Sequence, residues 1–191
     1  MHYAPKTLKG GFFASHNSLI NLDHGPRKLT GTYECSHNKL TSLRGAPRRA
    51  PRFFSCENNN LRNLMGSPNS VHFNFNCNSN QLTSLKGAPN KIGGNFNCAF
   101  NKLTSLRGIH KYFKGGWIKG RLDLSQNPIT SHVLGVMLIP ELKGVDYWSA
   151  TLNVEHEKVA EILNYHLQND RDVIQCQQDL IDAGLKAYAQ L

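Results

Sequence analysis

A short motif returns every 21 residues along the N-terminal part of this 191-residue chain. The clearest copy runs from Phe75 to Pro89 and reads FNCNSNQLTSLKGAP. Its Cys position is filled in five in-register copies by Ala14, Cys35, Cys56, Cys77 and Cys98. Its Asn position is filled by Asn17, Asn38, Asn59, Asn80 and Asn101. A fixed period with apolar residues at constant places is typical of a solenoid, in which each coil stacks on the next.

Each repeat combines a strand-like half with a turn-like half. Phe75 and Cys77 alternate with Asn residues, which predicts a half-buried strand with Phe and Cys inward. We expect Asn80 to bond backbone groups of adjacent coils, while Leu82 and Leu85 return to the core. The following Lys-Gly-Ala-Pro blocks an α-helix, so an irregular or 3-10 return side is predicted.

The repeat predicts an α/β-type leucine-rich-repeat solenoid with a parallel concave sheet of about six short strands. We assign residues 1–140 to the solenoid, as five 21-residue coils and one irregular coil, and residues 141–191 to an acidic helical C-terminal cap. Glu155–Leu167 and Asp170–Ala189 show helical periodicity, with Asn153 as the expected N-cap of the first helix. A cap of this kind covers the apolar end of the last coil.

The sixth coil is interrupted before its strand. Asn127 follows Asn101 by 26 residues, and the five extra residues fall within Lys111–Gly120. This segment combines lysines with Tyr112, Phe113 and Trp117. One interpretation is a variable loop that bulges from the solenoid, and the other is a contact loop for a partner.

Charge divides the chain at the same boundary as the repeats. Residues 1–140 hold 18 Lys and Arg against 4 Asp and Glu, whereas residues 141–191 hold 4 against 9. A basic body attracts an acidic partner, either a protein surface or a nucleic acid.

The cysteines are expected to be structural. Four of the five recur at the repeat interval and should stack as a buried ladder, and Cys176 should lie in the helical core. Close Cys pairs of the kind that bind zinc are missing from the sequence, so we expect no metal and no cofactor. Reduced thiols, the lack of a long apolar run and the lack of a secretory signal at the start predict a cytoplasmic protein with no membrane contact.

The pattern F-x-C-x-x-N-x-L-T-S-L-x-G-A-P resembles the short leucine-rich repeats of bacteria and bacteriophages. Its near-identical LTSLxGAP copies, and the ending VIQCQQDLIDAGL from Val173, are most similar to small repeat proteins of tailed phages. The resemblance covers residues 8–130 most strongly and implies the fold. It also resembles bacterial effectors in repeat length, but residues 141–191 are too few for the catalytic domain of those effectors that are ubiquitin ligases.

Outward positions of the predicted strands supply the first set of candidate partner-binding residues. They are Phe13, Thr32, Glu34, Phe53, Ser55, Glu57, Asn74, Asn76, Asn95, Asn97 and Arg121. Phe13 and Phe53 stand out because the repeat does not require an outward aromatic residue. Glu34 and Glu57 resemble a carboxylate pair, although acids on a binding face are commoner, and the equivalent positions of His16 and His37 follow from the repeat.

Basic residues supply the second set, on a predicted edge of the solenoid. They are Arg44, Arg48, Arg49, Arg52, Lys86 and Arg107. The bland interpretation is a solvated flank, and the functional one is an electrostatic track for an acidic protein or nucleic acid.

The sequence shows no nucleophile elbow, phosphate loop or metalloprotease helix, so we expect a binding protein and no enzyme. The leading hypothesis is a phage-encoded inhibitor or adaptor that occludes a host enzyme or anti-phage defence protein. The alternatives are a nucleic-acid-binding protein that uses the basic edge and a minor virion component.

Overall fold

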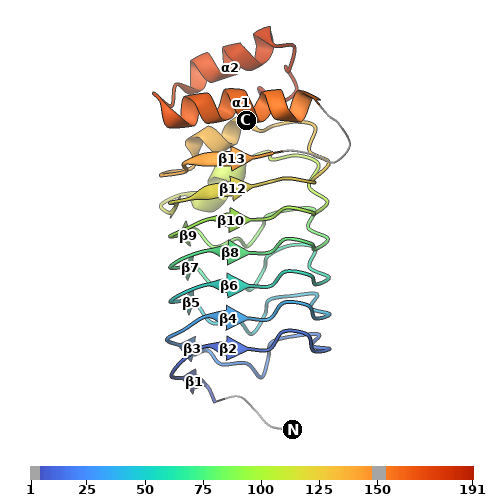
Figure 1. The fold of residues 1–191 in the computed structure, drawn as a ribbon, viewed down its shortest axis with the longest axis vertical. Helices are drawn as coiled ribbons and strands as arrows, with labels where there is room; N and C mark the ends of the chain where they lie inside the picture. The colour runs from blue at the N-terminus through green and yellow to red at the C-terminus, as the bar shows by residue number, and fades with distance from the viewer. Residues whose placement is uncertain (1–4, 148–153) are drawn as a thin grey trace.

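The chain folds as a stack of parallel coils with two helices at one end (Figure 1), which confirms the predicted solenoid and helical cap. In the computed structural model, residues 5–147 and 154–191 are described. One strand from each of seven coils joins a parallel sheet, here called the main sheet, which exceeds the predicted six strands by one. Its strands are β2 (Phe12–Phe13), β4 (Tyr33–Glu34), β6 (Phe54–Ser55), β8 (Phe75–Asn76), β10 (Phe96–Asn97), β12 (Arg121–Asp123) and β13 (Gly144–Asp146).

The inner face of the main sheet carries a ladder of aromatic rings. Phe54 pairs in register with Tyr33 and Phe75, and its ring centroid lies 5.1 Å and 5.6 Å from theirs. Phe96 extends the ladder at 5.4 Å from Phe75. All four rings are fully buried, because the constant repeat places each of them directly over the next.

Hydrogen bonds between coils explain why the repeat Asn returns at a constant spacing. Asn80 Nδ2 donates to the carbonyl oxygens of Cys77 and Asn78 in its own coil and of Cys56 in the preceding coil. Its Oδ1 accepts from the backbone N–H of Leu61 at 3.0 Å. The bend after each strand would otherwise bury unpaired backbone groups, so the Asn side chain satisfies them, as predicted.

A second, narrower sheet runs beside the main one and was not anticipated. We call it the side sheet, with strands β5 (Arg49–Ala50), β7 (Ser70–Val71), β9 (Lys91–Ile92) and β11 (Trp117–Ile118). In each of these strands the first residue faces outward and the second is buried. The first two coils pair separately, through β1 (Thr7–Leu8) and β3 (Lys28–Leu29). The return side is therefore more regular than predicted.

Glycine in the LxGAP segment allows adjacent coils to approach closely. Gly66 has a φ of 91°, and a Cβ there would lie 2.5 Å from the backbone nitrogen of Arg44 in the preceding coil. Gly45 and Gly87 meet the same obstacle. The glycine is therefore required by stacking as well as by backbone conformation.

The insertion before the sixth coil is only in part an exposed loop, at Lys114 and Gly115. It begins with the 3-10 helix η1 (Ile109–Phe113), which packs against a second 3-10 helix, η2 (Leu134–Leu138). Phe113 is fully buried, with its ring centroid 6.3 Å from that of Phe96. The strand position after Phe96 holds the smaller Leu122, so Phe113 fills the remaining space. Our prediction of Phe113 as a contact residue was wrong.

The helical region starts later than predicted, because β13 lies inside the segment assigned to the cap. β13 pairs with β12, and its Val145 and the following Tyr147 are buried. In the register of Val145 the position of the repeat Asn is filled by Ala150, so the sequence does not show the period continuing here. The solenoid therefore reaches at least Asp146.

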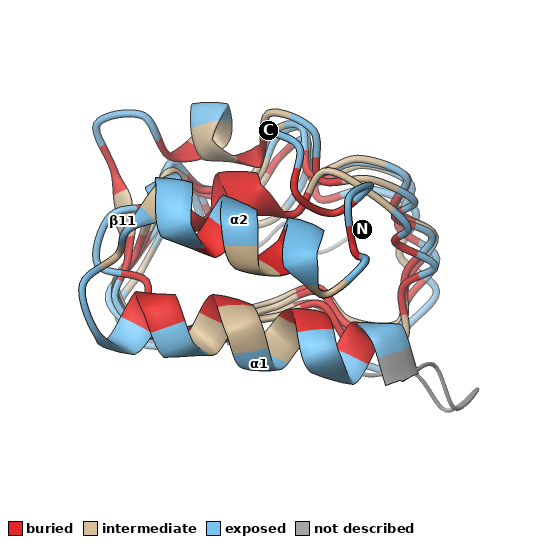
Figure 2. Ribbon diagram, turned by 90° about the horizontal axis from the view of Figure 1, so that it is seen from above, coloured by how far each residue is buried: buried red, intermediate tan, exposed pale blue. Residues whose placement is uncertain are grey.

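Two helices, α1 (Val154–Gln168) and α2 (Val173–Asp182), lie side by side over the end of the stack (Figure 2). Val159, Leu163 and Leu167 of α1, and Cys176 and Leu180 of α2, are buried. The predicted N-cap Asn153 lies outside the described residues. Neither helix is long and apolar enough to cross a bilayer, and the same holds for the rest of residues 5–147 and 154–191.

The second helix ends earlier than the predicted Ala189. Gly184 adopts a φ of 79°, and the N–H of Leu185 bonds the carbonyl of Leu180. This left-handed glycine terminates the helix. At its start, the side chain of Asp172 accepts from the N–H groups of Ile174 and Gln175, which makes it the N-cap.

Candidate functional site

The outer face of the main sheet brings the first set of predicted residues together. One row, in strand register, holds Phe13, Glu34, Ser55, Asn76 and Asn97 and continues through Asp123 and Asp146. The residue just before the strand forms a parallel row with Thr32, Phe53, Asn74 and Asn95, which continues as Arg121. All of the predicted residues except Glu57, which follows β6 by two residues, therefore lie in two neighbouring rows.

Polar side chains on this face bond one another across coils. Glu34 Oε1 accepts from Ser36 Oγ at 2.5 Å and from Ser15 Oγ at 3.2 Å. Glu57 Oε2 accepts from Asn76 Nδ2 at 2.5 Å. The two glutamates are thus engaged as hydrogen-bond acceptors, a structural role that accounts for both carboxylates without catalysis.

The two Asn residues before β8 and β10 replace missing backbone pairing. Asn74 Oδ1 accepts from the N–H of Asn95, and Asn95 Oδ1 accepts from the N–H of Arg121, both at 2.9 Å. Arg121 in turn reaches Asp146, with its Nε 3.1 Å from both carboxylate oxygens. This hydrogen bond to Asp146 raises the pKa of the Arg121 guanidinium. The central polar face is held rigid by these contacts.

Aromatic residues flank the polar face on both sides. Where the chain enters the main sheet, Phe53 stacks on Phe73 with ring centroids 5.3 Å apart, and both side chains are exposed. Where the chain leaves the sheet, Phe100 is 53% exposed. Phe13, in the first strand, is 74% exposed. Phe13 and Phe53 were predicted, whereas Phe73 and Phe100 were not.

Phe100 was missed, although a signal for it exists in the sequence. The equivalent positions of other coils hold His16, His37, Asn58 and Ser79. All of these residues, and Phe100, have a φ between 51° and 56°. Asn tolerates this left-handed region better than Phe does, so Phe100 combines backbone strain with an exposed apolar ring. An aromatic residue at an otherwise polar position was the available signal.

His16 and His37 occupy this same position in the first two coils. Their rings stack with centroids 4.2 Å apart, as the repeat register predicts. His37 Nε2 lies 3.9 Å from Glu57 Oε1. The left-handed backbone at this repeat position and the stacking of the coils explain why the two His rings lie against each other.

The predicted basic edge divides into separate sites. Arg44, Lys86 and Arg107 are exposed at one repeat position, where a preceding Ser hydroxyl accepts from each backbone N–H. Met65 interrupts this row in the third coil. Arg48 and Arg49 instead line open depressions over the side sheet. Arg52 is exposed just before Phe53 and lines neither depression. The six basic residues therefore do not form one track.

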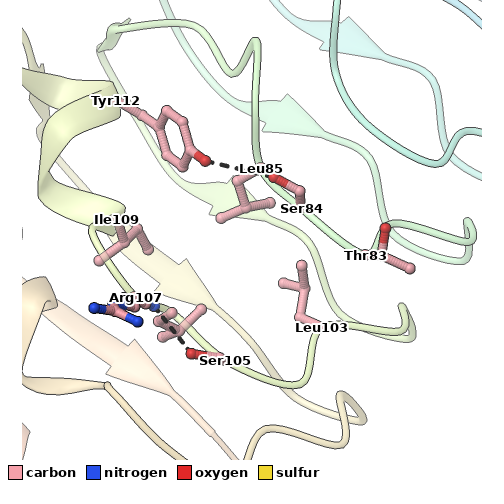
Figure 3. Close-up of a pocket in the computed structure, with 9 residues that line it drawn as sticks. Thr83, Ser84, Leu85, Leu103, Ser105, Arg107, Ile109 and Tyr112 are labelled. Atoms are coloured by element: carbon pink, nitrogen blue, oxygen red, sulfur yellow. Dashed lines mark hydrogen bonds between the residues drawn. The ribbon is translucent and has the colours of Figure 1, made fainter. Parts of the chain in front are cut away.

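A small open pocket of about 190 Å³ lies on the return side, between the fourth and fifth coils (Figure 3). Tyr112 from η1 leans over it, and its hydroxyl lies 3.4 Å from Ser84 Oγ. Arg107 is at the opposite side of the pocket, beside Ile109. Of the three predicted insertion residues, Tyr112 is thus half-buried in this pocket, while Trp117 is the outward residue of β11.

The repeat cysteines form the predicted buried ladder and carry no reactive thiolate. Burial raises the pKa of Cys35, Cys56, Cys77 and Cys98 well above that of an exposed thiol. The thiols of Cys35 and Cys98 donate to backbone carbonyls at 3.2 Å and 3.1 Å. Within residues 5–147 and 154–191, no three His, Cys, Asp or Glu side chains are grouped to hold a metal ion.

Comparison with protein-family models, with curated proteins and with solved structures finds no match to this chain.

Proposed function

We propose that the chain is a non-catalytic protein-binding module that holds a partner protein on the outer face of its main sheet. The observation that carries the proposal is Phe100. Its exposed ring contributes little to the core, while its left-handed backbone costs about 1 kcal/mol or more. An exposed aromatic side chain that lowers stability is best explained by a contact made outside the protein.

The rest of the face supports a protein partner. Binding energy in protein interfaces concentrates in a few aromatic or arginine anchors within a polar surround. Phe13 and Phe100 provide exposed rings, and the hydrogen-bonded Glu34, Glu57 and Asn76 provide a polar surface near them. A surface whose side chains are already ordered loses less entropy when a partner binds.

The resemblance of the repeats to those of tailed-phage proteins supports a bacterial host protein as the class of partner. On that basis we extend the proposal to a host enzyme or defence protein that is occluded by the bound solenoid. The alternative of a minor virion component has no feature of the surface in its favour.

Capture from a bacterial lysate with substituted baits tests the proposal. The baits are the wild-type chain, Phe100→Asp, Phe13→Asp and Ile174→Asp. Ile174 is 79% exposed on α2, away from the main sheet, and is the matched control for exchanging an exposed apolar residue for Asp. Phe53 is left unchanged because it lies between β5 of the side sheet and β6 of the main sheet, so its exchange would affect both surfaces.

The proposal predicts a protein that wild type and Ile174→Asp retain and that Phe100→Asp and Phe13→Asp lose. Recovery of no specific protein, or equal recovery by all four folded baits, would overturn it.

A further inference from the structure

The outer face of the side sheet is basic, and it meets the surface proposed to hold a partner protein only at the corner that carries Phe53 and Phe73. Two adjoining depressions cover it, and they share Arg49, Pro51 and Asn69 as lining residues. The cations that line them are Arg27, Lys28, Arg48, Arg49, Lys91 and Lys119. Within the described part of the chain, neither lining includes an Asp or Glu.

The cations are spaced by the fold. Arg49 pairs in register with Ser70, Ser70 with Lys91, and Lys91 with Trp117. Parallel strands lie about 4.8 Å apart, so the row from Arg49 to Trp117 covers about 14 Å. Lys28 holds the same repeat position one coil earlier, which extends the row to about 19 Å. Few of these charges are neutralised, and Lys119 has Glu141 at 3.5 Å.

Aromatic rings are interleaved with these cations. Trp117 lies between Lys91 and Lys119, whose Nζ atoms are 4.7 Å and 5.4 Å from the ring centroid. Phe73 is 43% exposed and lines the same depression, with the edge of His72 against it at 5.0 Å. The sequence alone did not place these aromatic residues beside the arginines, because they come from different coils.

We propose that the side-sheet face binds single-stranded nucleic acid, with the cations on its phosphates and with Trp117 and Phe73 stacking on its bases. A positive groove combined with exposed aromatic rings is the usual construction of a sequence-tolerant single-strand site. A row of about 19 Å matches five or six stacked nucleotides at about 3.4 Å each. When a lysine leaves the Trp117 ring for a phosphate, the ring face becomes free for a base.

An acidic peptide would satisfy the same cations but would leave the aromatic rings without a matching flat partner. A duplex would present its phosphates but keep its bases stacked inside. The aromatic rings therefore favour an unpaired strand.

Fluorescence anisotropy with labelled 15-nucleotide single strands of mixed sequence, as DNA and as RNA, tests the inference at about 50 mM salt, where phosphate contacts are strong. The same strand in duplex form and a polyglutamate peptide are the other probes. The charge variant is Arg49→Glu with Lys91→Glu. Its control is Lys39→Glu with Lys102→Glu, which changes net charge equally at two exposed lysines of the opposite corner. Both double variants replace outward side chains and should stay folded.

We expect the Arg49→Glu, Lys91→Glu variant to lose at least tenfold in affinity for the single strand, while the control stays within about threefold. For two lost phosphate contacts, the slope of log K against log salt should fall in magnitude by about 1.4. Binding of the single-stranded nucleic acid should quench the fluorescence of Trp117, and Trp117→Phe should remove this quenching. The relative affinities of DNA and RNA identify which strand fits better.

Equal losses in the charge variant and its control would overturn the inference, because binding would then follow net charge alone. So would duplex or polyglutamate binding as tightly as the single strand, or no binding at this salt. The capture test changes Phe13 and Phe100, whereas this test changes Arg49, Lys91 and Trp117, so the two proposals fail independently.

Discussion

Asn164 of α1 takes the place of a further strand beside Val145 of β13. Its Oδ1 accepts from the N–H of Val145 at 2.7 Å, and its Nδ2 donates to the carbonyl of the same residue at 2.9 Å. A single side chain thus pairs both outward backbone groups of Val145 at the end of the main sheet. Without such a partner, the unpaired backbone groups of an edge strand tend to pair with other chains.

The first prediction is that Asn164→Leu destabilises the cap and opens this edge. The N–H of Val145 loses its partner, while its carbonyl keeps the bond from Arg121 Nη2, so unfolding free energy should fall by on the order of 1 to 2 kcal/mol. Self-association should then rise with protein concentration in sedimentation velocity. Asn169→Leu, at an exposed Asn just beyond α1, is the control and should change neither quantity. A monomeric Asn164→Leu protein of unchanged stability would show that α1 alone covers the edge.

The second prediction concerns the Asn ladder. Asn80→Ala should lower the free energy of unfolding by on the order of 3 kcal/mol, because it leaves buried backbone groups of two coils unpaired. Asn17→Ala is the matched exchange in the first coil. Asn17 is exposed and bonds carbonyls of its own coil, so its loss should be much smaller. Urea denaturation measures both, and equal losses would refute the role of Asn80 between coils.

The sequence predicted those parts of the fold that repeat. Cys77, Asn80 and Phe75 stand at fixed intervals, and stacking forces each of them into the core or onto the backbone. β13 was missed because it follows the last repeat, and its contacts come from β12 and α1. The side sheet was missed because each of its strands is two residues long, too short for an alternation to be visible.

The candidate surfaces were predicted in part for the same reason. Outward positions of the main strands follow from the alternation, so Glu34 and Asn76 were found. Trp117 and Arg49 lie far apart in the sequence and meet on one face through the pairing of four side strands. Phe113 appeared to belong to a loop because nothing local shows that Leu122 leaves space beside Phe96.

The third prediction concerns thiol reactivity. All five cysteines are free and buried, and burial also raises the pKa of the Cys176 thiol to about 12. Since the thiolate is the reactive form, the folded protein should react with Ellman's reagent only as fast as it unfolds. All five thiols should react at once in denaturant. Rapid reaction of any thiol under native conditions would contradict the buried ladder.

The fourth prediction concerns acid stability of the cap. His166 is buried, with its Nε2 2.8 Å from Asp179 Oδ2 and its Nδ1 3.5 Å from Asp170. The hydrogen bond from His166 lowers the pKa of Asp179 below its ordinary value of 3.8. A depressed carboxyl pKa contributes stability above the unfolded value, and this contribution is lost as the pH falls through the folded value.

Unfolding free energy should therefore drop as the pH falls below about 4. Asp179→Asn should flatten this drop, whereas Asp182→Asn, an exposed exchange on the same helix, should leave it in place. Denaturant titrations at a series of pH values measure the effect. A profile for Asp179→Asn that parallels wild type would rule out the hydrogen bond between His166 and Asp179 as its cause.

The most direct test of a binding role for the main sheet is Phe100→Asn, because it separates stability from function. Asn58 already occupies the equivalent place with a φ of 51°, so Asn should relieve the backbone strain of Phe100. We predict that thermal unfolding shifts upward, by an amount equivalent to about 1 kcal/mol. Affinity for the protein captured by wild type should fall at least tenfold in the same variant. A lower unfolding temperature together with unchanged affinity would show that Phe100 serves the fold, and it would contradict the proposed function.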